Sequence, residues 1–171
     1  MKRYSKLIPQ VTRDLLFEEC DDRRNVEAIL SALFKEHKYR KVMTPTVEFY
    51  DVFAENDLGI EAEEMYKLSD SQGRTTVLRP DNTAPIARPV ATRPSKEDFP
   101  VRLYYNQNVY VRNKSLAGRT DETEQSGIEL IGDGSIDADI EVISMAYEAL
   151  KRNNVSSFKL ELCHAGFFKS I

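Results

Sequence analysis

A small set of polar residues has side chains that suit the binding of a free amino acid. Asp81 and Thr83 lie at an expected helix start, and their oxygens can accept hydrogen bonds from an α-ammonium group. Arg112 ends a long apolar segment, and a guanidinium can bind a carboxylate through two parallel hydrogen bonds. Gln125 and Glu129 are four residues apart, so on a strand they share one face. We treat these five residues as the candidate binding site.

The residue types alone also fit a plainer interpretation. Gln125 can accept from the same ammonium group, and Glu129 can accept from a ring N–H such as that of imidazole. Polar residues on one face of a strand, however, usually form the solvated side of an antiparallel sheet. The spacing therefore permits amino-acid binding without singling it out.

Hydrophobic periodicity predicts three helices around the candidate residues. One runs from about 21 to 37, with an aspartate as its N-cap. A short one is capped by Asp81 or the asparagine after it, and is expected to break or kink at Pro89. A third is capped by Ser135 or by the aspartate two residues later. The predicted apolar face of this third helix consists of Ile140, Ile143, Ala146, Tyr147 and Leu150.

Two pairs of strand-forming segments predict an antiparallel arrangement. Residues 65–69 and 75–78 are typical of a hairpin, with Gly73 in its turn. Residues 101–112 are rich in tyrosine and valine, and residues 124–131 return after a loop. If these two longer segments pair, Arg112 is expected close to the face that carries the candidate residues.

Further strands complete the predicted fold. Residues 39–48 are expected to form a strand interrupted by Pro45, which cannot donate to a ladder and is therefore placed at an edge or interface. Apolar residues alternate over 158–162, as in a last strand. The elements together predict the α+β class, an antiparallel sheet flanked by helices, in a single domain over residues 1–171.

The composition argues against several other classes of protein. The 171 residues are 41% hydrophobic and 30% charged, which suits one packed domain. A net charge of −4 gives no support for nonspecific nucleic-acid binding, which depends on Lys and Arg. Cys20 and Cys163 lack metal-ligand spacing and are expected to be reduced thiols. Since no segment is long and apolar enough for a membrane span or a signal peptide, we expect no membrane association and a cytoplasmic location.

Several segments resemble the class II aminoacyl-tRNA synthetases, and histidyl-tRNA synthetase in particular. TPTVE (44–48) is similar to motif 1, whose proline lies at the dimer interface in that family. YKLSDSQGR and VLRPDNTAPIAR resemble the family's hairpin and substrate loop. RLYYNQNVYVR resembles motif 2, GRTDETEQSGIELIG the strand beyond it, and DADIEVI the following helix. The resemblance covers nearly the whole chain in the same order, and it implies the class II fold and a homodimer through motif 1.

The resemblance also implies which residues bind histidine. Four of them keep the residue type of the synthetase, while Asp81 stands in place of a glutamate and can still accept from an ammonium group. The implied histidine-binding residues are Asp81, Thr83, Arg112, Gln125 and Glu129.

The positions that the resemblance implies for ATP carry different residue types. Lys114 replaces an acid that recognises adenine, Thr123 replaces an aromatic residue that stacks on it, and Asp121 replaces a basic residue. Loss of a base stack alone costs about 1–3 kcal/mol. Reversed charges near phosphate add repulsion to that loss. We therefore expect ATP binding to be lost, and no cofactor or metal to be required.

The loop NKSLAGR (113–119) resembles the ATP phosphoribosyltransferase regulatory subunits, which are paralogues of histidyl-tRNA synthetase, more than it resembles the synthetase itself. This resemblance implies a non-catalytic subunit that binds histidine and controls the short-form ATP phosphoribosyltransferase catalytic subunit at the first step of histidine biosynthesis, without tRNA. One alternative is a portion of a histidyl-tRNA synthetase that activates histidine with ATP. Another is a dimerisation or scaffold module with a vestigial pocket.

One family motif is missing from the sequence. Motif 3, with its second ATP-binding arginine, is not found, nor are the later glycine-rich and tyrosine-bearing segments of the family. We therefore expect the N-terminal half of a class II core, with the remainder of the parent protein missing and one wall of the pocket with it.

Overall fold

The computed structural model describes residues 7–9, 11–54, 59–92, 99–113 and 119–163. They belong to two compact units, the first ending at Asp133 and the second beginning at Gly134. The first unit contains two three-stranded sheets with helices, and the second is built on one long helix. The predicted α+β class is therefore confirmed.

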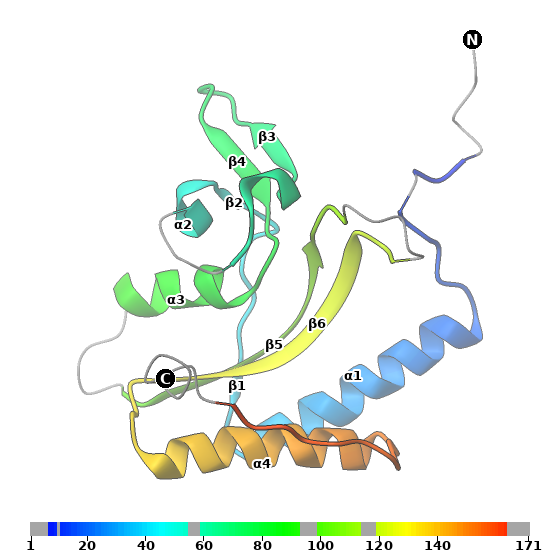
Figure 1. Cartoon of the computed structure of the whole chain (residues 1–171), viewed down its shortest axis with the longest axis vertical. Helices are drawn as coiled ribbons and strands as arrows, with labels where there is room; N and C mark the ends of the chain where they lie inside the picture. Colours follow the sequence, from blue (N-terminus) through cyan, green and yellow to red (C-terminus); the bar gives the residue numbers. More distant parts are fainter. Residues whose placement is uncertain (1–6, 10, 55–58, 93–98, 114–118, 164–171) are drawn as a thin grey trace. The chain divides into compact units, whose positions relative to one another are not determined.

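The larger sheet is dominated by a long twisted ribbon of two strands (Figure 1). β5 (Val101–Tyr110) and β6 (Glu122–Ile131) pair antiparallel along their whole length, as predicted. β1 (Arg40–Lys41) joins the other edge of β5 and runs parallel to it. The sheet is thus mixed, whereas the sequence predicted an antiparallel one.

The smaller sheet has the order β2–β4–β3 and is antiparallel throughout. Its strands are β2 (Val47–Phe49), β3 (Lys67–Ser69) and β4 (Thr75–Leu78). Gly73 in the turn between β3 and β4 has a φ of 78°, a conformation that glycine adopts without steric cost. The predicted hairpin and its turn are confirmed.

The prediction of one strand over residues 39–48 was wrong. β1 belongs to the larger sheet and β2 to the smaller one. Between them Pro45 has no N–H, and the backbone N–H of Thr44 donates to the side chain of Gln107 at 2.9 Å. Neither residue can therefore continue a strand ladder.

The long helix α1 (Glu18–Glu36) begins earlier than predicted. Its N-cap is Phe17, which makes no side-chain cap hydrogen bond, so the predicted aspartate cap was wrong. Acidic residues in the first turn instead complement the positive end of the helix dipole. Leu33 and Phe34 are buried, and the Phe34 ring lies 5.6 Å from that of Tyr104 on β5. These contacts hold α1 against the larger sheet.

Three short helices precede β5 in the chain. They are α2 (Asp51–Ala54), the 3-10 helix η1 (Ala62–Glu64) and α3 (Thr83–Thr92). α3 continues through Pro89, so the helix does not break there, whereas the expected kink stays a prediction. The helix loses one backbone hydrogen bond at the proline, but it buries Ile86 and Val90 on either side of it.

A hydrophobic cluster fixes the start of α3. Phe53, Met65 and Val77 form its buried centre, and Ala84 of α3 packs against them. Farther along α3, Arg88 donates to the buried carboxylate of Glu48 in β2, with 2.8 Å between Nη2 and Oε2. These contacts anchor the helix whose first turn carries the candidate site.

The second unit consists of α4 (Ile136–Arg152) and the segment after it. Ser135 is the N-cap and accepts from the backbone N–H of Ala138 at 3.2 Å, as predicted. Ala138 and Met145 are buried, whereas most of the predicted apolar face is exposed. The predicted strand over 158–162 was wrong, because these residues pair with no strand of the described chain.

Membrane spans, metal sites and disulfides are absent from the described residues. No helix among the described residues is long and apolar enough to cross a membrane. No group of three or more His, Cys, Asp or Glu side chains in the described ranges is arranged to hold a metal ion. Cys20 and Cys163 are free thiols.

Candidate functional site

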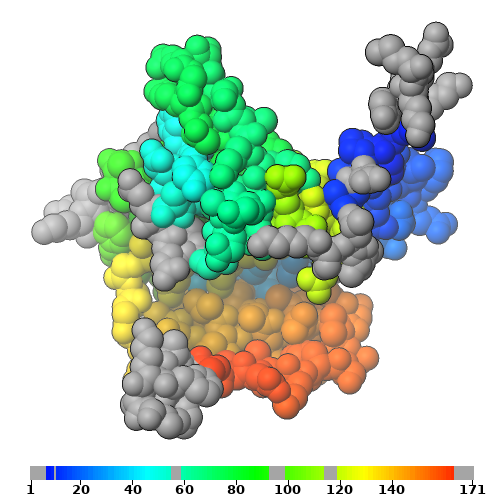
Figure 2. Space-filling model, turned by 45° about the horizontal axis from the view of Figure 1, so that its top comes forward, coloured from blue at the N-terminus to red at the C-terminus, as the bar shows by residue number. Residues whose placement is uncertain are grey.

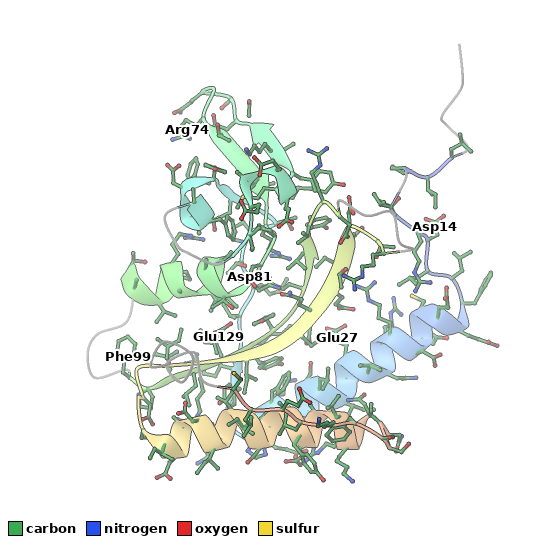
Figure 3. The ribbon with its side chains drawn as sticks, viewed as in Figure 1. Asp14, Glu27, Arg74, Asp81, Phe99 and Glu129 are labelled. Carbon is green, nitrogen blue, oxygen red and sulfur yellow. The ribbon has the colours of Figure 1, made fainter. Side chains whose placement is uncertain are left out.

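The candidate site is built on the first turn of α3 and on β6. Asp81 precedes α3, and its Oδ2 accepts from the backbone N–H of Thr83 at 2.7 Å. This side-chain turn is a common use of aspartate at a helix start. The Thr83 hydroxyl donates to Oε1 of Glu129 on β6 at 2.8 Å. Asp81 and Glu129 thus lie near each other between α3 and β6 (Figure 3).

The two carboxylates of this site repel each other. Burial raises the pKa of Glu129, and the charge of Asp81 raises it further against the opposing hydrogen bond from Thr83. Among the described residues, no basic side chain forms a salt bridge with either carboxylate. A pair of carboxylates without a cation is a favourable place for an ammonium or a protonated ring nitrogen.

Tyr105 is a further member of the site, in a segment for which the sequence pattern predicted only a strand. It lies opposite Gly127 in the β5–β6 ladder and is 8% exposed. Burial and the charges of Glu129 and Asp81 raise the pKa of Tyr105 to about 12, while Thr83 acts against this shift. The phenol therefore stays protonated beside the carboxylates. A glycine within a strand was the available signal, since it marks a close approach by another group.

Gln125 is linked to the site through a buried polar network. Asn82 Nδ2 donates to Gln125 Oε1 at 3.0 Å, and Asn82 is completely buried. Gln107, directly opposite Gln125 in the ladder, and Arg79 continue the network and are 6% and 5% exposed. The sequence did not predict a network of Arg79, Asn82 and Gln107. Hydrophobic periodicity does not show which polar residues become buried or which partners they bind.

Arg112 lies two residues beyond the end of β5 and contacts Glu64 and Tyr66. Its backbone N–H donates to the carbonyl of Glu64 at 2.8 Å, and its guanidinium lies 5.6 Å from the ring centroid of Tyr66. The side chain is exposed, and its charge lowers the pKa of Asp121.

A cavity of about 550 Å³ adjoins the site at Gln125. Its wall includes Arg13, Arg119, Asp121, Thr123 and Gln125. The N-terminal segment borders it, because the backbone N–H of Asp121 donates to the carbonyl of Val11 at 2.8 Å. Figures 1 and 2 show this segment, in blue, beside the end of the β5–β6 ribbon.

Two of the three positions that differ from the ATP-binding pattern lie on this cavity. Thr123 offers no ring for stacking on a base. Asp121 is 7% exposed, and its carboxylate accepts from the Tyr66 hydroxyl and from Asn113 N and Nδ2 at 3.0 and 3.1 Å. These bonds hold a negative charge at the cavity wall. The third position, Lys114, lies outside the described residues.

The chain is similar to several known proteins. A family model described as histidyl-tRNA synthetase matches residues 11–171. The ATP phosphoribosyltransferase regulatory subunits of Clostridium acetobutylicum and Clostridium novyi are 45% and 44% identical to this chain over all 171 residues. The chain spans only 42% and 41% of their lengths.

Solved structures give the same result for the fold. A Bacillus halodurans structure described as an ATP phosphoribosyltransferase regulatory subunit/histidyl-tRNA synthetase has a TM-score of 0.81 and 41% identity, over 92% of this chain and 41% of that one. Apo histidyl-tRNA synthetase of S. aureus has a TM-score of 0.70 and 28% identity, over 87% of this chain and 35% of that one. The class II synthetase-like fold that the sequence predicted is confirmed. Since the family model matches nearly the whole sequence, the chain belongs to the histidyl-tRNA synthetase family.

Proposed function

We propose that this chain is part of a regulatory subunit that binds free histidine and controls an ATP phosphoribosyltransferase catalytic subunit in histidine biosynthesis. The observation that carries the proposal is the arrangement of Asp81, Thr83 and Glu129, which brings two carboxylates together without a basic partner in the described part of the chain. The two Clostridium relatives are named ATP phosphoribosyltransferase regulatory subunits, and the proposed catalytic partner is taken from that name.

Each part of histidine has a chemical counterpart in this site. Asp81 and the Thr83 hydroxyl can accept from the α-ammonium group. Glu129 can accept from an imidazole N–H, and its charge favours the protonated ring. The protonated phenol of Tyr105 adds a donor for an unprotonated ring nitrogen or for a carboxylate. The site therefore favours an amino acid whose side chain carries an N–H over an amino acid with an aliphatic side chain.

The cavity beside the site supports a subunit without synthetase activity. The fixed charge of Asp121 would repel nucleotide phosphates, and Thr123 cannot stack on adenine. Histidine would then bind without being activated. Its effect would be regulatory if it bound two states of the complex with different affinities.

The segment that resembles motif 1 supports a homodimer as part of this proposal. Met43, Val47 and Phe49 are 78%, 45% and 42% exposed on either side of Pro45. Apolar side chains at that exposure are available for burial against a second copy. A cytoplasmic location, without membrane or tRNA, accompanies this function.

Histidyl-tRNA synthetase activity is the second candidate function. The 28% identity to a solved histidyl-tRNA synthetase favours it, as do Arg13 and Arg119 on the cavity wall. In that case the histidine carboxylate would attack the α-phosphate of ATP, and basic side chains would stabilise the developing charge. Exchange of pyrophosphate into ATP that depends on histidine would identify this activity.

The proposal is tested by reconstituting the full-length protein with an ATP phosphoribosyltransferase catalytic subunit and measuring the transferase rate as histidine is added. We expect histidine to inhibit the complex, and Glu129→Gln to raise the required histidine concentration at least tenfold. Glu63→Gln removes an exposed carboxylate of η1 and serves as the matched control. A transferase rate that does not depend on this protein would contradict the proposal.

A further inference from the structure

We infer that an apolar stripe along α4 is a self-association surface, on which the same helix of a second copy of this chain packs antiparallel. The stripe consists of apolar residues that recur at spacings of four and three along one face of the helix: Ile136, Ile140, Ile143, Tyr147 and Leu150. These residues differ from those around Pro45 that support the proposed homodimer. The α4 contact is therefore a second one between copies, and it does not depend on the proposed function.

Most of the stripe is open to solvent. Ile136, Ile140 and Tyr147 are 76%, 54% and 47% exposed, although isoleucine is among the residue types most often buried in folded proteins. Ala138 and Met145, the buried residues of α4, lie about 200° around the helix from the stripe. The helix thus has two apolar faces, of which only one is covered in the described part of the chain. A contiguous exposed apolar patch of this kind is typical of an interaction site.

The segment after α4 covers only one end of the stripe. The Phe158 ring lies edge-on against that of Tyr147, with 5.4 Å between the ring centroids. Figure 1 shows this segment running beside the helix. Tyr147 still keeps about half of its surface exposed, and Ile136 and Ile140 at the other end are more exposed than Tyr147. The larger part of the stripe is therefore available to a partner.

Charged residues at the two ends of the stripe complement each other. Asp137 lies in the first turn of α4, and Lys151 lies in its last turn. The Lys151 ammonium group is 5.7 Å from the centroid of the Tyr147 ring, which places it at the edge of the stripe. At about 100° per residue, Asp137 and Lys151 lie along the same edge. In an antiparallel pair each Asp137 therefore faces Lys151 of the second copy, whereas a parallel pair would bring like charges together.

The stripe is symmetric about Ile143. Full overlap of two antiparallel stripes places Ile143 of one copy against Ile143 of the other. Ile136 then meets Leu150, and Ile140 meets Tyr147, over a length of about 21 Å. A surface that supplies its own apolar and charged complement suits a two-fold contact, in which both copies use the same patch. A second copy of this chain is thus the occupant that the pattern of α4 specifies.

Disulfide cross-linking of the full-length protein tests the contact. In a background whose cysteines are replaced by serine, Ile143→Cys places a thiol at the two-fold axis. We expect a mild oxidant to join two copies, so that a mixture of tagged and untagged protein gives a mixed pair on a non-reducing gel. Val142→Cys is the matched control, because Val142 is also an exposed aliphatic residue but points about 100° away. Its cross-linking yield should be lower by about fivefold or more, since a disulfide requires closely placed Cβ atoms.

Exchange of the charges tests the antiparallel orientation. Asp137→Lys should lower the yield from Ile143→Cys by about fivefold, because it brings two lysine side chains together at each end of the contact. Combining Asp137→Lys with Lys151→Asp should restore the yield. If the two charges only complemented the helix dipole, the double variant would be worse than the single one, since both ends of α4 would then carry the unfavourable charge.

Three results would overturn the inference. Equal cross-linking yields from Ile143→Cys and Val142→Cys would show that the pairs form by random collision. A double charge variant that does not recover would show that Asp137 and Lys151 do not meet. A thiol at position 143 that does not react with a maleimide in the full-length protein would show that another part of the same protein covers the stripe.

Discussion

The hydroxyl of Thr83 donates to the carboxylate of Glu129 at 2.8 Å and so joins the first residue of α3 to β6 across 46 positions of sequence. Thr83 is also tied to Asp81 through its backbone N–H. One residue thus sets the separation of the two carboxylates. The bond holds the acidic side of the site together before any ligand arrives, which is the kind of preorganisation that favours binding.

Thr83→Val keeps the shape of the side chain but removes the hydroxyl. We expect it to weaken histidine binding by about tenfold to a hundredfold, since a hydrogen bond to a charged group contributes about 1.5–3 kcal/mol. Thr83→Ser, which keeps the hydroxyl, should stay within a few-fold of the wild type. Calorimetric titration measures both. Equal losses in the two variants would show that the methyl group matters and the hydroxyl does not.

Glu129→Gln should make the protein more stable at neutral pH. A carboxyl group with a raised pKa stabilises the fold only while it is protonated, so its contribution is lost as the pH rises through the folded-state pKa, which lies above 4.5. The variant should therefore unfold at a higher temperature than the wild type near pH 7, with the difference shrinking toward pH 4. A thermal unfolding series across pH measures this. An advantage that is the same at every pH would contradict the assignment.

Asp121→Asn should show the opposite dependence on pH. Burial opposes the ionisation of Asp121, but hydrogen bonds from Tyr66 and Asn113 and the charge of Arg112 outweigh it and lower its pKa. The ionised group therefore stabilises the fold above about pH 3.8, and that contribution disappears as the pH falls through the folded-state pKa. We expect the variant to lose about 1–3 kcal/mol at pH 7 and less in acid. Denaturant unfolding at the two pH values checks the difference.

Gly127→Ala should destabilise the protein and disturb the site together. A Cβ at this position would lie 2.5 Å from the Tyr105 hydroxyl oxygen and 2.7 Å from its ring carbon Cζ, so the ring must move. Overpacking of this kind costs about 1–3 kcal/mol. Gly134→Ala is the matched control, since the Cβ that it adds would have nothing within 4 Å. Equal stabilities of Gly127→Ala and Gly134→Ala would contradict the prediction. They would show that the Tyr105 ring does not need the space beside Gly127.

The elements that the sequence predicted well are those with a local signal. The hairpin around Gly73, the β5–β6 pair and the Ser135 cap all follow from turn chemistry, alternation or capping. The start of α1 did not, because Phe17 caps it without a side-chain hydrogen bond. The strand over residues 39–48 also failed, because the N–H of Thr44 is taken by a side chain 63 residues away.

Within the candidate site, too, the positions that depend on local sequence were predictable, and those that depend on distant partners were not. The four-residue spacing of Gln125 and Glu129 was enough to place them on one face, and the Asp81 turn was foreseeable from its position before α3. The place of Arg112 over Tyr66 depends on how β5 ends, which the sequence does not specify. Asn82 and Tyr105 acquire their roles only from partners on another strand.

Titration of histidine into the full-length protein, with and without ATP and magnesium, tests the central claim most directly. We predict that histidine binds with the same affinity in both conditions and that ATP gives no binding signal. Binding of ATP that tightens the binding of histidine would contradict this claim and would indicate a synthetase instead.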